Sequence, residues 1–242
     1  MIRSHRYRAF TLLELLMAIA AIGVLIGLSM VALNSSRDKA TQWKCMSNMR
    51  QTQMGIGLMG GRDSLLPFAS FIPFQADGPA KPFQDMMFAL SDAIGVGKPV
   101  KTGGKTSKGW VLYDVAPNFQ CPRDVGYTVD AKIVEDMGYD AAHPFARQVF
   151  MSADYVPGGQ MTKLERRGMD PEVVRRTVSR VWEQAPWVPV LDELWQWHNY
   201  KSRTAYGNAS YVDGSVRKSD WGTNAQKQRW AELMQQVLPG DK

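Results

Sequence analysis

The sequence predicts an α+β fold in which one long amino-terminal helix precedes a head built from shorter helices and strands. Three observations predict it: an uncharged apolar run over residues 15–33, a helical spacing of apolar residues that continues beyond this run, and strand-turn-strand patterns near the carboxyl end. The 242 residues are 45% hydrophobic and 21% charged, a composition that excludes a disordered chain or a fibrous rod. Because a single apolar run is long enough to cross a bilayer, a protein with many membrane spans is also excluded.

The first predicted element is a membrane-spanning helix over residues 10–33, which at 1.5 Å per residue is about 36 Å long. Polar, helix-compatible sequence follows it directly instead of a small-residue cleavage site, so we expect it to remain on the mature protein. Glu14 is its informative residue, because an ionised carboxylate within a membrane span costs roughly 3 kcal/mol and calls for a cationic partner. The other interpretation is that Glu14 reaches the membrane interface and needs none.

The same helix is predicted to continue outside the membrane as an amphipathic segment over residues 34–60, and Gly60-Gly61 is expected to end it. Apolar residues recur there at steps of three or four, with one longer gap: Ala40, Trp43, Met46, Met49 and Ile56. A helix from residue 10 to about residue 59 would be roughly 75 Å long. We therefore expect half of it in lipid and half packed on the head.

The first half of the head is predicted to contain one short helix and one strand. Phe83, Met86, Met87, Leu90 and Ile94 have helical spacing and read as core residues. Residues 97–109 are rich in lysine and glycine and are expected to form a solvated loop, while residues 110–115 alternate like a strand.

The second half is predicted to contain further helices and an antiparallel hairpin. Asp170-Pro171 has the pattern of a helix start, for a helix that reaches Trp182. Residues 187–193 form a predicted strand, and residues 209–217 show two strands around an Asp-Gly turn. A final helix is expected between Thr223 and Gly240.

The amino terminus carries a resemblance to a known family. The run Arg8-Ala9-Phe10-Thr11-Leu12-Leu13-Glu14-Leu15-Leu16 resembles the processing and N-methylation motif of type IV pilins and type II secretion pseudopilins. The resemblance implies that a prepilin peptidase cuts between Ala9 and Phe10 and methylates the Phe10 amine, and that Glu14 guides subunit docking. Ala9 departs from the glycine usual before the cut, so cleavage is expected to be slower. The implied orientation has the basic leader in the cytoplasm and the head outside.

A second resemblance concerns the head. The segments Cys45-Met-Ser-Asn48-Met-Arg-Gln51, Phe119-Gln-Cys121-Pro122 and Asn208-Ala-Ser-Tyr211-Val-Asp213-Gly214-Ser-Val216 resemble the pilin-like group with an H-x9-DG domain. Arg203 stands where the histidine of that group would be, and the nearest histidine is His198. The resemblance implies a long helix packed against an antiparallel sheet.

The two cysteines, Cys45 and Cys121, leave two interpretations open. An exported domain is oxidised, so a disulfide is chemically available and would close a loop of about 75 residues, worth about 4 kcal/mol in the chain-entropy model. The alternative is two buried free thiols.

We expect no cofactor, with a calcium ion held by acidic residues as the alternative. Asp192, Glu193 and Asp213 supply oxygen ligands suited to calcium, against the alternative that they cap turns. His143 and His198 are isolated from other ligand residues, which argues against a zinc site. The sequence contains no nucleophile elbow, so we do not expect an enzyme.

The predicted organisation is a cytoplasmic leader over residues 1–9, a membrane helix over 10–33, its amphipathic continuation over 34–60 and an exoplasmic head over 61–242. The formal charge of +6 falls to +3 without Arg3, Arg6 and Arg8, so we expect no nucleic-acid partner. The main hypothesis is a structural subunit of a type IV pilus or type II secretion filament. It would be stored in the inner membrane, and its partners would be prepilin peptidase, the lipid bilayer, other pilin subunits and an inner-membrane assembly platform. The alternatives are a tethered exoplasmic binding or enzymatic domain, and a DNA-capturing pilin.

Overall fold

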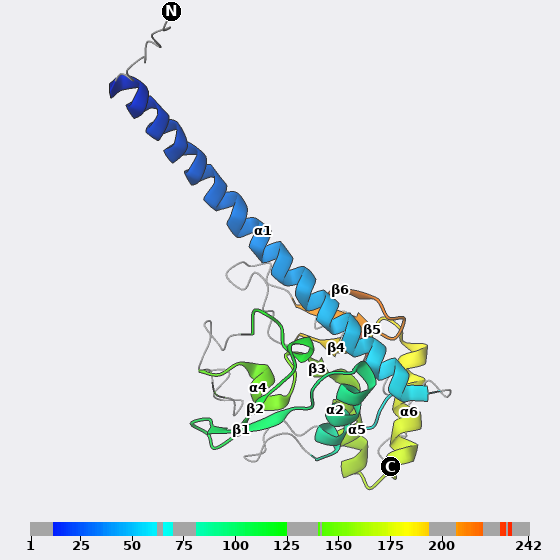
Figure 1. The fold of residues 1–242 in the computed structure, drawn as a ribbon. Helices are drawn as coiled ribbons and strands as arrows, with labels where there is room; N and C mark the ends of the chain where they lie inside the picture. Colours follow the sequence, from blue (N-terminus) through cyan, green and yellow to red (C-terminus); the bar gives the residue numbers. More distant parts are fainter. Residues whose placement is uncertain are drawn as a thin grey trace, which may run out of the picture. The chain divides into compact units, whose positions relative to one another are not determined.

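The fold is described from a computed structural model, which describes residues 12–61, 65–69, 81–124, 140, 142–193, 207–219, 228–230 and 232–233. The chain divides into two compact units, Met1–Thr41 and Gln42–Lys242, and each is considered by itself. Together the elements form the predicted α+β fold, with a long amino-terminal helix followed by shorter helices and small antiparallel sheets (Figure 1).

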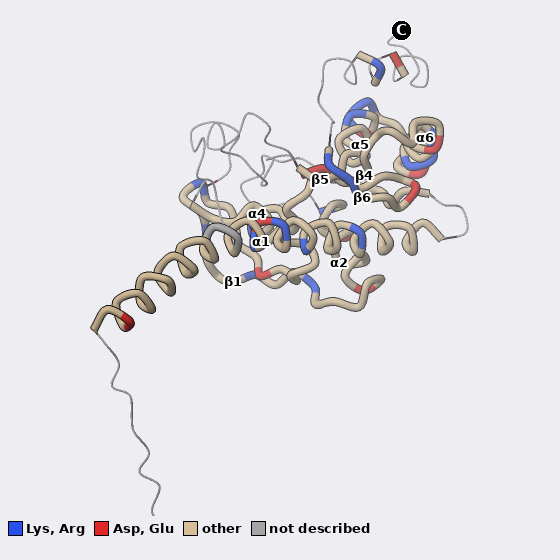
Figure 2. The backbone as a smooth tube through the Cα atoms, turned by 90° about the horizontal axis from the view of Figure 1, so that it is seen from above, with Lys and Arg blue, Asp and Glu red and all other residues tan. Residues whose placement is uncertain are grey.

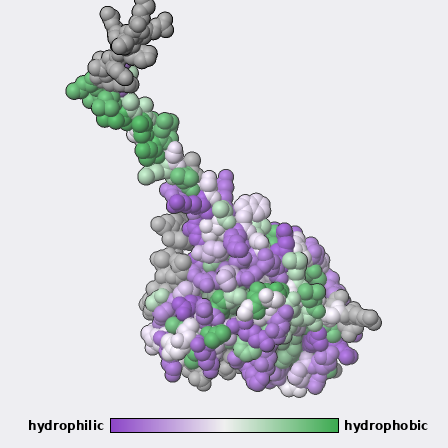
Figure 3. Space-filling model, in the orientation of Figure 1, coloured by the Kyte–Doolittle hydropathy of each residue, from purple (hydrophilic) through white to green (hydrophobic). Residues whose placement is uncertain are grey.

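Helix α1 runs from Leu12–Gly60, and its first part is apolar and exposed (Figure 3). No charged residue lies between Glu14 and Arg37, which leaves a long uncharged stretch of the tube in Figure 2. Among the described residues, α1 is the one helix long and apolar enough to cross a membrane by length and composition. The predicted end is confirmed, because Gly61 adopts φ 62°, a left-handed conformation that stops helices.

The part of α1 within the second unit packs one face into the head. The buried residues follow helical spacing: Cys45, Asn48, Met49, Thr52 and Ile56. The predicted apolar face is wrong at Trp43, which is 69% exposed. The buried face is rotated away from Trp43 because it includes polar side chains that bond the head: Asn48 donates to the carbonyls of Pro117 and Gln120.

Helix α2 (Lys81–Ile94) confirms the predicted short helix and buries Phe83, Met86, Met87 and Leu90. The predicted strand over 110–115 is also confirmed, as β2 (Val111–Asp114). The expectation of a loop over residues 97–109 is wrong in part, because β1 (Val100–Lys105) pairs antiparallel with β2 around a register irregularity between Lys101 and Lys105. Strand β1 lacks a hydrophobic alternation because it is almost wholly exposed.

The four-stranded antiparallel sheet has the order β3-β4-β5-β6. Its strands are β3 (Asp154–Tyr155), β4 (Pro189–Asp192), β5 (Asn208–Tyr211) and β6 (Val216–Lys218). Strands β4 to β6 confirm the predicted strand and hairpin, and Gly214 in the hairpin turn has φ 77°.

The remaining helices complete the head. They are the 3₁₀ helix η2 (Pro117–Phe119), α4 (Phe145–Val149), α5 (Val156–Arg166) and α6 (Pro171–Gln184). The predicted helix start at Asp170-Pro171 is confirmed, because the Asp170 carboxylate accepts from the backbone N–H groups of Glu172 and Val173. Of the predicted last helix, residues 228–230 and 232–233 are helical, and its other residues lie outside those described.

The hydrophobic core of the second unit lies where α1, α2, α5 and α6 meet the four-stranded sheet. Its largest fully buried side chains include Trp182 of α6 and Tyr211 of β5. Polar bonds add to this packing, since Gln53 of α1 accepts a hydrogen bond from the Ser210 hydroxyl of β5. Strand β5, which pairs with β4, is thereby held close to the buried face of α1.

Candidate functional site

The amino-terminal features lie in the first unit. Glu14 is in the first turn of α1 and is exposed, within an otherwise uncharged helical stretch. Ala9 and Phe10, which flank the predicted cut site, lie outside the described residues. The cut site is therefore inferred from the sequence. Glu14 is in the first described turn of α1, and an acidic group near a helix amino terminus is favoured by the helix dipole.

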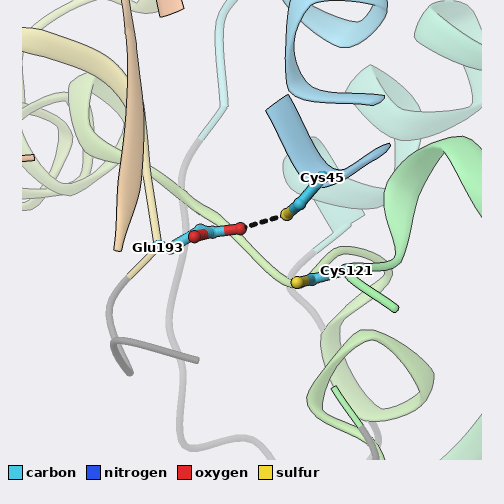
Figure 4. Close-up of side chains that lie close together, drawn as sticks. All are labelled: Cys45, Cys121 and Glu193. Carbon is cyan, nitrogen blue, oxygen red and sulfur yellow. Dashed lines mark hydrogen bonds between the residues drawn. The ribbon is translucent and has the colours of Figure 1, made fainter. Parts of the chain in front are cut away.

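A separate cluster of three ligating side chains is buried in the second unit (Figure 4). Cys45 comes from α1, Cys121 from the turn after η2, and Glu193 from the residue after β4. Each is 3% exposed, and their sulfur and oxygen ligand atoms all lie within 4.8 Å of one another. The Cys45 thiol donates a hydrogen bond to Glu193 Oε1.

The Glu193 carboxylate is held from its other side by the start of β5. Its Oε2 atom accepts from the Asn208 backbone N–H at 2.7 Å and from Asn208 Nδ2 at 3.0 Å. A glycine precedes Asn208 for a steric reason, because a β-carbon at Gly207 would lie 2.8 Å from the Glu193 β-carbon. The close approach of β5 therefore fixes the rotamer of Glu193 and points Oε1 toward the sulfur atoms.

Burial perturbs the acidity of this cluster. The pKa of the Cys45 thiol is raised by its hydrogen bond with Cys121, by burial and by the neighbouring Glu193 charge. Burial also raises the pKa of Glu193, although hydrogen bonds from Cys45 and Asn208 act in the opposite direction. In the absence of a cation, protons are therefore retained on these groups at higher pH than usual.

A small cavity adjoins the cluster. It has room of about 20 Å³, enough for one water molecule, and its lining includes Asn48, Cys121 and Glu193. Asn48 is 4% exposed, and both of its amide donor bonds go to backbone carbonyls. Its Oδ1 atom is buried without a hydrogen-bond partner among the described residues. Asn48 thus brings a buried amide acceptor to the group of residues that lines this cavity.

The structure does not bring the predicted calcium ligands together. Among the described residues, the cluster of Cys45, Cys121 and Glu193 is the one group of three or more His, Cys, Asp or Glu residues close enough to share an ion. Asp192 and Glu193 are consecutive at the end of β4, and of the three predicted ligands Glu193 alone belongs to this cluster. Asp213 caps the hairpin turn, where its Oδ1 accepts from the Ser215 N–H and its pKa is lowered by hydrogen bonds from Ser215.

Cys45 and Cys121 are two buried thiols whose sulfur atoms lie within 4.8 Å of each other. The disulfide between Cys45 and Cys121 therefore stays a prediction. Sequence reasoning did not connect Glu193 with these cysteines, because it stands 148 residues from Cys45 and no short spacing motif joins them. The signal that was available is that Glu193 and Asn208 stand at or next to the ends of predicted strands, whereas Cys45 lies in the middle of the predicted helix.

Comparison with known families places the amino terminus in a recognised class. Residues 4–30 match the prokaryotic N-terminal methylation motif, which supports a type IV pilin-like protein. The motif fits a substrate of prepilin peptidase, and the apolar half of α1 that it covers is consistent with a membrane-anchored protein of this type. No curated protein and no solved structure matched the chain.

Proposed function

We propose that the chain is a prepilin-like structural subunit of a type IV pilus or a type II secretion pseudopilus. One observation carries the proposal: the methylation motif over residues 4–30 leads directly into an exposed apolar helix with Glu14 in its first turn. A membrane tether alone needs no acidic residue there, whereas Glu14 costs roughly 3 kcal/mol in a bilayer. The cost is offset when a cation on a neighbouring subunit pairs with it.

In this proposal, prepilin peptidase removes residues 1–9 and methylates the new amine of Phe10. The leader faces the cytoplasm, α1 anchors the subunit in the inner membrane, and the head lies outside. The assembly platform then extracts the subunit into a filament, in which Glu14 pairs with the Phe10 amine of a neighbour. The head has a structural role and no catalytic activity. Filament assembly through α1 does not depend on whether the head belongs to the H-x9-DG subgroup.

The test compares filament yield with membrane-pool yield for wild type, Glu14→Ala and Glu14→Gln. Membrane levels should not fall, because removal of the carboxylate makes insertion easier. Loss of one partner of a buried pair typically costs 3 to 5 kcal/mol, which predicts a reduction of sheared filaments by more than about 100-fold. Ser29→Ala is the matched control, since the Ser29 hydroxyl donates to the Leu25 carbonyl of its own helix.

Intact mass of the membrane-pool protein verifies in every variant that the chain begins at a methylated Phe10. Wild-type filament yields for both Glu14 variants would refute the docking role. In that case an anchored exoplasmic domain, with α1 as its tether, becomes the better account.

A further inference from the structure

The buried cluster of Cys45, Cys121 and Glu193 has the composition and geometry of a metal site. Three separate parts of the head supply one ligand atom each, and these atoms all lie within 4.8 Å of one another (Figure 4). A tetrahedral zinc ion with bonds of about 2.0 to 2.3 Å holds its ligand atoms roughly 3.5 to 3.8 Å apart. No separation among the three ligand atoms exceeds 4.8 Å, and the hydrogen-bonded Cys45 sulfur and Glu193 Oε1 atoms would move apart to coordinate one ion.

The donor chemistry favours zinc over calcium or magnesium. Two thiolates are soft ligands that zinc accepts and that calcium, which takes six or more oxygens, does not. The carboxylate of Glu193 is a common third ligand of zinc. Zinc binding replaces protons and involves no redox step. Each thiol releases its proton to solvent when its sulfur bonds the ion, and a proton on Glu193 is released in the same way.

Glu193 is oriented as a metal ligand should be. Asn208 occupies Oε2 with two hydrogen bonds, which leaves Oε1 directed at the sulfur atoms. Bonds of this kind from outside the coordination sphere fix a ligand's rotamer and are typical of metal sites. A disulfide would make no use of the carboxylate, and its formation would remove the thiol proton that Oε1 accepts. A cation would replace the Cys45 thiol proton as the partner of Oε1, and it would stabilise the ionised form of this buried carboxylate.

The fourth position is provided by the adjoining cavity. Its room of about 20 Å³ accommodates one water molecule, next to Cys121 and Glu193. Asn48 lines the same cavity, and its Oδ1 atom, buried and without a partner among the described residues, would accept a hydrogen from such a water placed beside it. Three protein ligands, one water and an acceptor for that water complete a four-coordinate site.

We propose that Cys45, Cys121 and Glu193 bind one zinc ion, with a water in the adjoining cavity as the fourth ligand. The site is structural and goes beyond the filament role, because it acts within a single head. The ion joins the middle of α1, the turn after η2 and the end of β4. Its loss loosens the head without changing the processing motif.

The experiment uses the full-length protein in detergent, purified without chelators or reductants. Elemental analysis should find one zinc per chain, and thiol labelling after denaturation should find two free cysteines. After removal of zinc, Co²⁺ should bind and produce a sulfur-to-cobalt charge-transfer band. Cys45→Ser and Cys121→Ser should each reduce this band roughly by half, because each removes one of two cobalt–sulfur bonds.

Glu193→Gln should weaken zinc binding at least about 10-fold, whereas Glu183→Gln, a change at an exposed glutamate of α6, should leave it unchanged. If a cysteine variant fails to fold, wild-type protein still decides: a chelator should lower its thermal midpoint, and added Zn²⁺ should restore it. Two outcomes overturn the proposal. One is a disulfide in the isolated protein without zinc. The other is reduced protein that binds neither Zn²⁺ nor Co²⁺ in proportion to its thiols.

Discussion

Two glycines on α1, Gly55 and Gly57, stand two residues apart and have opposite surroundings, which makes them a matched pair of test positions. Gly55 is buried against α2, and a β-carbon there would collide with Ile94 Cγ2 and lie 2.6 Å from Leu90 Cδ1. Gly57 is exposed, and a β-carbon there would meet nothing within 4 Å. The perturbation is alanine at either position.

The expected magnitudes follow from two opposing effects. Alanine is favoured over glycine in a helix interior by about 0.8 to 1 kcal/mol. At Gly57 nothing opposes this gain, so Gly57→Ala should stabilise the protein by about 1 kcal/mol. At Gly55 the added methyl group must displace Ile94 or Leu90, and overpacking of this kind costs about 1 to 3 kcal/mol. The net effect of Gly55→Ala is therefore a destabilisation of about 1 kcal/mol.

The assay is thermal or chemical unfolding of the full-length protein in detergent, followed by tryptophan fluorescence. A change of 1 kcal/mol shifts the midpoint of a chain of this size by about 2 to 4 °C. Gly57→Ala should move the midpoint up, and Gly55→Ala should move it down. Ile94→Ala, which removes Cγ2, should recover part of the loss when it is combined with Gly55→Ala. If both single variants were stabilised equally, the described packing of α1 on α2 would be wrong.

Two further predictions concern single carboxylates. Burial raises the pKa of Glu193 above its ordinary value of 4.5, so in the metal-free, reduced protein the contribution of this one carboxyl to stability should be fully present below about pH 4.5 and be lost as the pH rises through the folded-state pKa. Glu193→Gln should remove this part of the pH dependence in unfolding titrations. Asp170→Ala should destabilise α6 by about 1 kcal/mol by removing its cap, and denaturant titration should find Asp170→Ser close to wild type, because serine caps equally well.

The elements that the sequence predicted have a strong local signal. Helix α2 repeats buried residues at helical spacing, α6 begins at an Asp-Pro cap, and the β5–β6 hairpin turns at Asp213-Gly214. Helix α5 lacks such a signal, because Pro157-Gly158-Gly159 in its first turn has the composition of a loop. Gly158 is explained only by the fold, since a β-carbon there would lie 3.0 Å from the carbonyl of Ala69.

The two candidate sites differed in predictability for a related reason. The methylation motif is contiguous, so the role of Phe10 and Glu14 could be inferred from adjacent residues. The buried cluster is assembled from α1, the turn after η2 and the end of β4, and its residues are related only by the packing of the head. Sequence reasoning placed Glu193 in a possible calcium set and tested zinc by histidine position, so it did not connect this carboxylate with the two cysteines.

The polar bonds between α1 and the head have a mechanical consequence. Asn48 is fastened to the carbonyls of Pro117 and Gln120, and Gln53 is fastened to Ser210. A purely apolar helix face can slide by one turn, about 5.4 Å, and meet similar surroundings. The face that carries these amides cannot slide in this way, because the movement would break several hydrogen bonds at once and leave buried polar groups without partners. A force along the axis of this helical segment is therefore transmitted to the head through these hydrogen bonds, and the helix does not slide past the head.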